Sequence, residues 1–316
     1  MTFRTRVITQ SVMPERTSLV SPRVSVVLPV FNAAAHLSEA LESILTQTFT
    51  DFELLAVYDE SIDESLAILQ AAAARDVRVR IIHGPGERLT GALNLGLQEA
   101  KGEFIARMDA DDVSLPMRLA MQVALMEKDN LDACGCHVQQ IDVSGSWGQA
   151  IPMPLNSSSI LVTLACTVPF AHGSVLLRLA FLKKLQLQYR PGVAVEDYDL
   201  WCRMVQSGAR LGNVDATLFL YRNLPNALSK VHARKNREAM YALRRSFVRS
   251  QIPELASAIT YLLGHPQDLP VPRFGYLLLA AHLLSIESGT PIRWRALAKT
   301  PAWVSARVLA KLVRGF

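Results

Sequence analysis

The chain has 316 residues, of which half are hydrophobic and 19% are charged. This composition excludes a disordered chain and allows one large α/β domain with an appendage, or two modest domains. Four cysteines are too few for a disulfide framework at this length, so we expect reduced thiols in a cytosolic protein. Residues 1–22 carry charge and no apolar stretch of signal-peptide length, which predicts a flexible tail.

The net charge of +5 is unevenly distributed along the chain. Residues 230–316 hold fourteen Lys and Arg against four Asp and Glu, whereas residues 1–229 hold nineteen basic and twenty-four acidic side chains. The longer part is therefore acidic and the shorter part strongly basic. A basic excess of this kind indicates a surface that meets something anionic.

Strands and helices alternate over the first part of the chain. Apolar and β-branched runs predict strands at 24–32, 52–60, 77–83 and 103–109, and apolar residues at helical spacing predict helices at 35–49, 61–74 and 90–102. Ser61 with Glu64 suits a capping box at the start of the second helix, and Gly102 suits a left-handed end of the third. The alternation predicts an α/β fold with a doubly wound, mostly parallel sheet flanked by helices.

Beyond residue 112 the pattern is less regular. It predicts a helix at 115–129, a strand at 132–142 and a helix at 193–208. The segment 144–160 is rich in Ser, Gly and Pro, and we expect a loop there.

Three stretches with polar or aromatic side chains stand at the ends of predicted strands. They are Pro29, Val30, Phe31 and Asn32 at the first strand, 58–60 at the second, and 109–112 at the fourth. Ligands of open α/β sheets bind beyond the carboxyl ends of the strands. We therefore expect these stretches to converge on one binding site.

The stretch FIARMDADD (104–112) ends an apolar strand in three aspartates. Carboxylates this close repel one another unless positive charge lies between them, and Arg107 could balance part of it. One interpretation is a solvated strand end, with Asp112 capping the next turn. The other is a site where Asp109 and Asp111 bind Mg²⁺ or Mn²⁺ and, through it, a diphosphate. The two neighbouring site-like stretches favour the metal interpretation.

Three segments in fixed order carry a resemblance to a known family. The stretches VSVVLPVFNAAAHLSEALESILTQTFTDFELLAV, TGALNLGLQEAKGEFIARMDADD and VEDYDLWCRM resemble the family 2 glycosyltransferases, over roughly residues 23–230. The resemblance implies a GT-A fold for this part of the chain. It also implies a nucleotide-sugar donor and a divalent cation, Mn²⁺ or Mg²⁺, as cofactor.

On the donor side, the resemblance implies roles for two of the strand ends. Pro29, Val30, Phe31 and Asn32 would surround the nucleotide base and ribose. Asp59 would accept the imide N–H of uracil or thymine and reject cytosine, whose N3 is itself an acceptor. The donor would then be linked to UDP or dTDP.

Around the reacting bond, the resemblance implies roles for four acids and one tryptophan. Asp111 would bind the metal directly, and Asp109 would share the metal site and lie nearer the ribose. Glu196 and Asp197 match the family's "ED" pair, with Asp197 as the base, and Trp201 completes the "EDxxLW" pattern. Asp197 would take a proton from the acceptor hydroxyl, so that a single displacement inverts the anomeric carbon.

The chain departs from the family pattern at three positions. The pattern "DDGSxD" is YDESID here, so Tyr58 replaces an acid and Glu60 replaces a glycine. If that glycine needs a positive φ, Glu60 must adopt a costly conformation or the turn must differ. In YRNLPNALS, Leu224 stands where relatives often have histidine. These departures keep open a catalytically degenerate, membrane-bound scaffold, against which the retained aspartates count.

Residues 231–316 are expected to form a helical, basic region. The apolar stretch 274–286 is too short to span a bilayer, and 293–316 carries six basic residues, no acid and two tryptophans along an apolar stripe. This pattern favours a helix on an anionic membrane surface, and hence a cytoplasmic protein bound peripherally at the inner face of the cell membrane. Helices packed on the catalytic domain are the alternative. No nucleic-acid-binding module accompanies the charge, so we expect no nucleic acid as a partner.

The function that the sequence favours is metal-dependent, inverting transfer of a sugar from a nucleotide donor to a saccharide or lipid-linked acceptor, as in cell-surface polysaccharide synthesis. A sugar-nucleotide nucleotidyltransferase is the enzymatic alternative. That class has a glycine-rich phosphate loop after the first strand, and PVFNAAAH has no glycine. The missing G-x-G-x-x-G counts equally against a dinucleotide-binding oxidoreductase.

Overall fold

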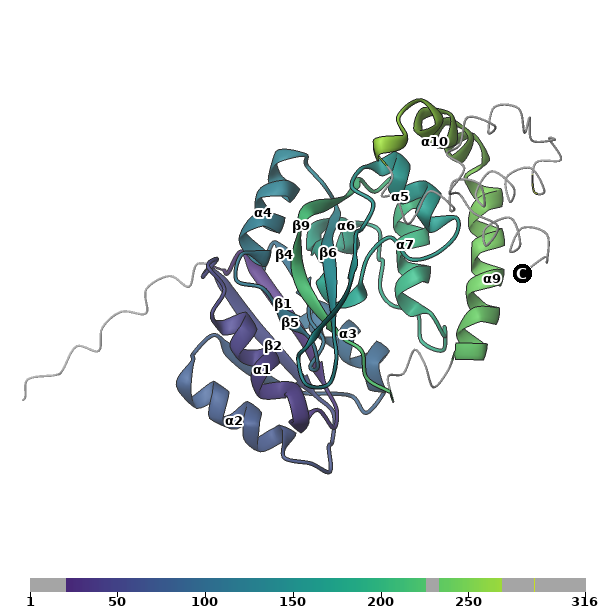
Figure 1. Cartoon of the computed structure of the whole chain (residues 1–316). Coiled ribbons are helices and arrows are strands. Elements are labelled where there is room, and N and C mark those ends of the chain that lie inside the picture. Colours follow the sequence, from purple (N-terminus) through teal and green to yellow (C-terminus); the bar gives the residue numbers. More distant parts are fainter. Residues whose placement is uncertain (1–20, 226–232, 269–286, 288–316) are drawn as a thin grey trace, which may run out of the picture.

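The structure is a computed structural model that describes residues 21–225, 233–268 and 287. Within these residues, nine strands form one sheet in the order β3-β2-β1-β4-β8-β6-β9-β5, with β7 paired to β6 (Figure 1). The strands are β1 (Val24–Val30), β2 (Phe52–Tyr58), β3 (Val79–His83), β4 (Phe104–Arg107), β5 (Val113–Ser114), β6 (Ala133–Ile141), β7 (Trp147–Ile151), β8 (Leu176–Arg178) and β9 (Leu211–Arg222). The helices are α1 (Ala34–Leu45), α2 (Ser65–Arg75), α3 (Arg88–Glu99), α4 (Arg118–Lys128), α5 (Ser157–Leu164), α6 (Leu179–Lys184), α7 (Glu196–Gln206), α9 (Ala233–Ser250) and α10 (Ile252–Gly264), with 3₁₀ turns η1 (His172–Ser174) and η2 (Pro266–Asp268).

The half of the sheet made of β3, β2, β1 and β4 is parallel. At its centre, Val27 of β1 lies between Leu55 of β2 and Arg107 of β4. In the other half, β8 runs antiparallel to β4 and β6, whereas β6 and β9 form a long parallel ladder. The fold is therefore α/β with a mixed sheet whose longest ladders are parallel, which confirms the predicted fold class.

Helices cover both faces of the sheet, as in a doubly wound fold. Val26 and Leu28 of β1 belong to a core closed by α1, α2 and α4, whereas Val27 belongs to a core closed by α3, α5, α6 and α7. Burial on both faces explains why the first strand is almost continuously apolar. Phe247 of α9 joins the second core, so α9 packs on the same domain (Figure 1).

The start of α2 differs from the predicted capping box. The helix begins at Ser65, and Glu64 makes no capping hydrogen bond. The Ser61 hydroxyl donates instead to the Asp59 carbonyl, at 3.0 Å. Ser61 is therefore part of the loop after β2, and the capping-box prediction is wrong.

Gly102 has a different role from the predicted left-handed helix end. Helix α3 ends at Glu99, the next residue is extended, and Gly102 has no positive φ. A Cβ at this position would lie 2.6 Å from the Ser25 backbone nitrogen. Glycine is required there because the chain passes directly against the start of β1.

The segment 144–160 is not the simple loop that its composition predicted. It contains β7 and the start of α5, where Asn156 and Ser159 form a reciprocal capping box. Residues 147–150 of β7 are all exposed, so this edge strand lacks the alternation that marks a half-buried strand. Polar composition therefore concealed a strand at the rim of the sheet.

Two further expectations concern cysteines and membrane spans. All four cysteines are free and buried, in line with reduced thiols. Within the ranges that the structure describes, no helix is long and apolar enough to cross a membrane. The stretches 274–286 and 293–316, and most of the N-terminal tail, lie outside the described residues.

Candidate active site

The carboxyl ends of β2, β1 and β4 lie next to one another at one edge of the sheet. Val30 of β1 pairs with Tyr58 of β2, and the Met108 N–H donates to the Val27 carbonyl at 3.1 Å. The stretches 29–32, 58–60 and 109–112 therefore leave the sheet as neighbours, which is the convergence that the sequence predicted.

The loop after β1 is tied to the loop after β2 by hydrogen bonds. The Asn32 backbone N–H donates to the Ser61 hydroxyl at 3.0 Å, and the Asn32 side-chain oxygen accepts from the Ile62 N–H at 2.9 Å. Asp63 accepts from the Ala34 N–H, also at 2.9 Å. Asn32 adopts a φ of 48°, a left-handed conformation that asparagine tolerates better than most residues. These hydrogen bonds between the two loops fix the conformation of both.

The residues expected around the nucleotide base differ in exposure. Phe31 is 55% exposed, Pro29 is half-buried, and Val30 is buried in the first core. Val30 presents its backbone carbonyl, which accepts from the Asp59 N–H at 3.0 Å. Phe31 is therefore the residue of this stretch with a free aromatic surface.

Asp59 is buried and held by the loop between β3 and α3. One of its carboxylate oxygens accepts from the Gly86 N–H at 3.2 Å. Gly84 approaches so closely that a Cβ there would lie 1.9 Å from the same oxygen. A carboxylate can accept further hydrogen bonds, so Asp59 can still receive one from a ligand N–H. The sequence HGPG marks a tight loop, but it does not reveal that these two glycines lie against Asp59.

The two departures at the end of β2 are accommodated by the turn. Glu60 has no positive φ, so the loss of glycine there causes no strain of the kind anticipated. The Tyr58 hydroxyl accepts from the Ser61 N–H at 3.0 Å, and its ring packs edge-on against His83. Tyr58 thus supports the turn from within.

The acidic loop, Asp109–Asp112, follows β4. Asp109 forms an ion pair with Arg107, whose side chain is 3% exposed. Burial, and then the negative charge of Asp109, raises the pKa of Asp111 to about 6. Burial raises the pKa of Asp112 well above its usual value, and one of its oxygens accepts from the Arg222 backbone N–H at 2.7 Å. Burial and carboxylate repulsion together outweigh the positive charge near this loop, so the pKa values of Asp111 and Asp112 stay raised.

The acid pair, Glu196 and Asp197, opens α7. Burial, and then the charge of Asp197, raises the pKa of Glu196 to about 7. Burial also raises the pKa of Asp197. A helix N-terminus favours carboxylates, but burial outweighs that effect here. A carboxylate with a raised pKa is better suited to accept a proton near neutral pH.

His172 lies beside the acid pair. Its Nε2 is 3.0 Å from the Tyr189 hydroxyl, and its Nδ1 is 3.9 Å from a Glu196 oxygen. Burial, and then the charge of Arg107, lowers the pKa of His172 well below its usual value, so the imidazole is neutral at pH 7. Trp201 is fully buried and packs edge-on against His172, so it supports the site from within the core. Tyr189 stands in an irregular segment and carries no signal in the sequence.

Arg107 joins the acidic loop to the acid pair electrostatically. Its positive charge lowers the pKa of Asp111 and Asp112 on one side and of both acids of the pair on the other, although burial leaves all four pKa values raised. Gly173 brings η1 against the loop, because a Cβ there would lie 2.8 Å from the Asp109 carboxylate. The guanidinium of Arg107 thus acts on the acids predicted to bind a metal and also on Asp197, which the sequence predicts as the base.

The residues present fit a divalent cation only in part. Among the described residues, no group of three or more His, Cys, Asp or Glu side chains is arranged to hold a metal ion. Asp109 and Asp111 supply two hard oxygen donors at a place where negative charge is incompletely balanced. Mg²⁺ is commonly bound by one or two carboxylates together with substrate phosphates. The acidic loop fits a cation whose remaining ligands come from a bound diphosphate.

Comparison with known proteins identifies the family. Residues 25–185 match the family described as glycosyl transferase family 2. The O-antigen biosynthesis glycosyltransferase WbnJ of Escherichia coli is 30% identical over 239 residues, which cover 75% of this chain and 93% of WbnJ. The chain belongs to glycosyl transferase family 2. The EpsE protein of Bacillus subtilis (strain 168) is 34% identical over 214 residues, which cover 66% of this chain and 76% of EpsE.

Solved structures agree with this membership at the level of the fold. TarS 1-349 of S. aureus, in complex with UDP-GlcNAc, has a TM-score of 0.61 at 17% identity, over 93% of this chain and 92% of that one. The mannosyltransferase PcManGT of Pyrobaculum calidifontis, in complex with GDP-Man and Mn²⁺, has a TM-score of 0.53 at 18% identity, over 94% and 80% of the two chains. This family 2 glycosyltransferase therefore has the GT-A fold that its motifs implied.

Replacing Arg107 tests the electrostatics of the site. We expect Arg107→Met to raise further the pKa of the carboxyls around it. The folded state then binds more protons than the unfolded state, so its stability falls as the pH rises through these values. The melting temperature should drop little at pH 5 but strongly at pH 8. At pH 8 the free energy of unfolding should fall by about 3 kcal/mol, because buried carboxylates then lack a partner.

Scanning fluorimetry between pH 5 and pH 8 measures this effect. Arg75→Met is the control, because Arg75 pairs with Glu42 on the exposed surface. A destabilisation of Arg107→Met that is equal at every pH would contradict the charge-sharing role.

Proposed function

We propose that this family 2 glycosyltransferase is metal-dependent and inverting, and that it transfers a sugar from a UDP- or dTDP-linked donor to a saccharide or lipid-linked acceptor. The observation that carries the proposal is the placement of the acidic loop and the acid pair around Arg107. One group supplies hard oxygen ligands and the other a carboxylate with a raised pKa. A donor diphosphate and an acceptor hydroxyl need those two chemistries side by side.

The donor is proposed to bind where the loops after β1 and β2 meet. Asp59 would accept the imide N–H of uracil or thymine with the capacity that its bond to Gly86 leaves free. Phe31 would pack against the base, since its ring is exposed at the same strand end. TarS has been solved with UDP and with UDP-GlcNAc, which supports a uridine donor in this fold.

The leaving group is proposed to meet the acidic loop. Asp111, with Asp109, would hold Mn²⁺ or Mg²⁺, and the bound cation would stabilise the negative charge that grows on the departing diphosphate. PcManGT has been solved with Mn²⁺ and GDP-Man, which supports divalent metal use in a protein of similar fold. The ion pair between Arg107 and Asp109 would hold the Asp109 side chain beside Asp111, where its oxygen could serve as a second ligand.

The acceptor is proposed to be activated by Asp197. Its carboxylate would remove the hydroxyl proton as that oxygen attacks the anomeric carbon from the face opposite the diphosphate, and one displacement inverts the configuration. Glu196 would be the donor-facing member of the pair, where its neighbour His172 is a neutral hydrogen-bonding group. WbnJ is named for O-antigen biosynthesis, which supports cell-surface polysaccharide as the product.

Two substitutions separate binding from chemistry. Asp111→Asn should weaken Mn²⁺-dependent binding of UDP and abolish release of the nucleoside diphosphate from the donor. Asp197→Asn should leave UDP binding intact and lower turnover by about 100-fold or more, because only proton removal is lost. Both are measured with a panel of UDP-, dTDP- and GDP-sugars, with release of the nucleoside diphosphate as the readout.

Asp51→Asn is the matched control, since Asp51 is exposed at the opposite end of β2. Wild-type protein that releases no nucleoside diphosphate from any donor, and gains no thermal stability from UDP with Mn²⁺, would overturn the proposed activity. Full turnover in Asp197→Asn would remove this residue as the base.

We also propose that residues 231–316 are a helical, basic region that holds the protein at the inner face of the cell membrane. The described part supports a basic surface: α9 has the sequence ARKNREAMYALRRSFVRS, and most of its side chains are exposed or half-buried. Glu287 pairs with Arg245 and Arg249 and so lies against α9. The segment 293–316 adds six basic residues and no acid.

Vesicle sedimentation tests the membrane proposal. Full-length protein should bind vesicles that contain phosphatidylglycerol and should not bind vesicles of pure phosphatidylcholine. Replacing Lys299, Arg307, Lys311 and Arg314 by Gln should reduce binding to anionic vesicles by more than about tenfold, since each basic residue near the surface contributes about 1 kcal/mol. Unchanged binding of this variant would contradict the proposal.

A further inference from the structure

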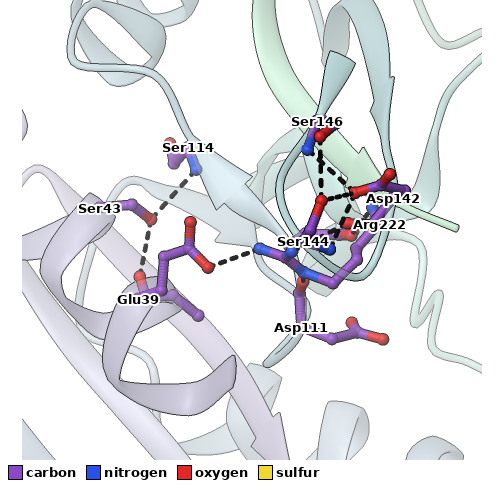
Figure 2. Close-up of polar contacts among 10 residues, drawn as sticks. Glu39, Ser43, Asp111, Ser114, Asp142, Ser144, Ser146 and Arg222 are labelled. Atoms are coloured by element: carbon purple, nitrogen blue, oxygen red, sulfur yellow. Dashed lines mark hydrogen bonds and ion pairs between the residues drawn. The ribbon is translucent and has the colours of Figure 1, made fainter. Parts of the chain in front are cut away.

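Arg222, the last residue of β9, makes contacts to three separate parts of the chain around the acidic loop (Figure 2). Its Nε donates to the Asp111 carbonyl at 2.8 Å, and its Nη1 donates to the Asp142 carbonyl at 3.1 Å. Its Nη2 pairs with a Glu39 oxygen at 2.5 Å. The backbone N–H of the same residue donates to the Asp112 carboxylate at 2.7 Å.

The partners of Arg222 are themselves fixed in place. Asp142 begins the turn between β6 and β7, and one of its carboxylate oxygens accepts from the Ser144 N–H at 2.8 Å and from the Ser146 N–H at 2.9 Å. Glu39 lies on α1, the helix that follows the proposed base-binding loop. The arginine therefore connects the acidic loop to a stiff turn on one side and to the donor-side helix on the other, as Figure 2 shows.

Helix α1 holds the other end of the acidic loop as well. The Ser43 hydroxyl accepts from the Ser114 N–H at 3.1 Å, and the side chain of Gln47, two residues beyond the end of α1, donates to the Leu115 carbonyl at 2.8 Å. Residues 114 and 115, directly after the acidic loop, are thus held at the C-terminal end of α1. Asp111 is linked to the same helix through Arg222 and Glu39.

We propose that Arg222 is a positioning residue for the metal site, and that Glu39 holds its guanidinium in the orientation that fixes Asp111. This inference rests on the proposed function, because it assigns a task to a residue that touches neither metal nor donor. The bond to the Asp111 carbonyl sets the peptide from which the proposed metal-binding carboxylate projects. The ion pair to α1 sets the distance between that carboxylate and the donor-side loops.

Lysine cannot take over this task. The Arg222 side chain is 2% exposed, and its Nε, Nη1 and Nη2 point at three partners in a fixed planar fork. A lysine ammonium has the same charge but presents one nitrogen on a flexible stem, so it leaves at least one of these acceptors without its donor. Charge alone would be kept in Arg222→Lys, and geometry would be lost.

The test measures how much Mn²⁺ is needed for UDP binding. In wild-type protein, UDP binding is followed by calorimetry at increasing Mn²⁺. For Arg222→Lys we expect the half-saturating Mn²⁺ concentration to rise by about 10- to 100-fold, the usual cost of losing a residue that orients a metal ligand. UDP affinity at saturating Mn²⁺ should return to the wild-type value, because the base-binding loops are untouched.

Glu39→Ala provides a second variant that keeps the arginine. It should shift the half-saturating Mn²⁺ concentration in the same direction by a smaller factor, and the double variant should be no worse than Arg222→Lys, because both act through one guanidinium. Glu42→Ala is the matched control: Glu42 lies on the same helix, its side chain is 56% exposed against 54% for Glu39, and it pairs with Arg75. It should not change the Mn²⁺ requirement.

The outcomes separate this inference from the proposed function. Wild-type UDP binding that does not depend on Mn²⁺ would overturn the proposed metal chemistry and this inference with it. Metal-dependent wild-type binding, combined with variants that lose thermal stability but keep the wild-type Mn²⁺ requirement, would overturn the positioning role alone. A Glu42→Ala effect equal to that of Glu39→Ala would also overturn it, since any charge on α1 would then suffice.

Discussion

The site depends on one buried guanidinium that faces more negative charge than it can neutralise. Arg107 is nearly inaccessible to solvent and pairs with Asp109, while the acidic loop and the acid pair lie within its electrostatic reach. Burial and mutual repulsion raise the pKa of Asp111 to about 6 and that of Glu196 to about 7, although the charge of Arg107 lowers both. Such an arrangement is costly in a protein unless a further positive charge joins it during function.

The fold explains how acids that repel one another come to share this place. Parallel strands β2, β1 and β4 end at the same edge of the sheet, and each releases a polar loop there. The antiparallel return through β8 brings η1 and His172 against the acidic loop, and β9 delivers Arg222 to its other side. Two cores, one on each face of the sheet, supply the rigidity that holds these loops. The repulsion is tolerated because the acidic loop and the acid pair are held by separate elements, the end of β4 and the start of α7.

The sequence predicted the parallel half of the fold because each strand and helix there has its own local pattern. Short elements escaped prediction: β5 has two residues and β8 three, too few to show any period, and exposed β7 shows no alternation. The carboxylates were identified from their place at strand ends and from family motifs. The roles of Tyr189 and Gly86 and the contacts of Arg222 were not predicted, because they join segments far apart in sequence. Gly102 was misjudged for the same reason, since its close neighbour Ser25 lies 77 residues away.

The central claim is that a divalent cation, bound together with a nucleoside diphosphate, neutralises the excess negative charge of the carboxylates around Arg107. Calorimetric titration of UDP into the full-length protein, once with Mn²⁺ and once with EDTA, tests this claim most directly. The account predicts that UDP binds at least about tenfold more tightly with Mn²⁺, a difference of about 1.4 kcal/mol or more. Equal affinity in Mn²⁺ and in EDTA would contradict it.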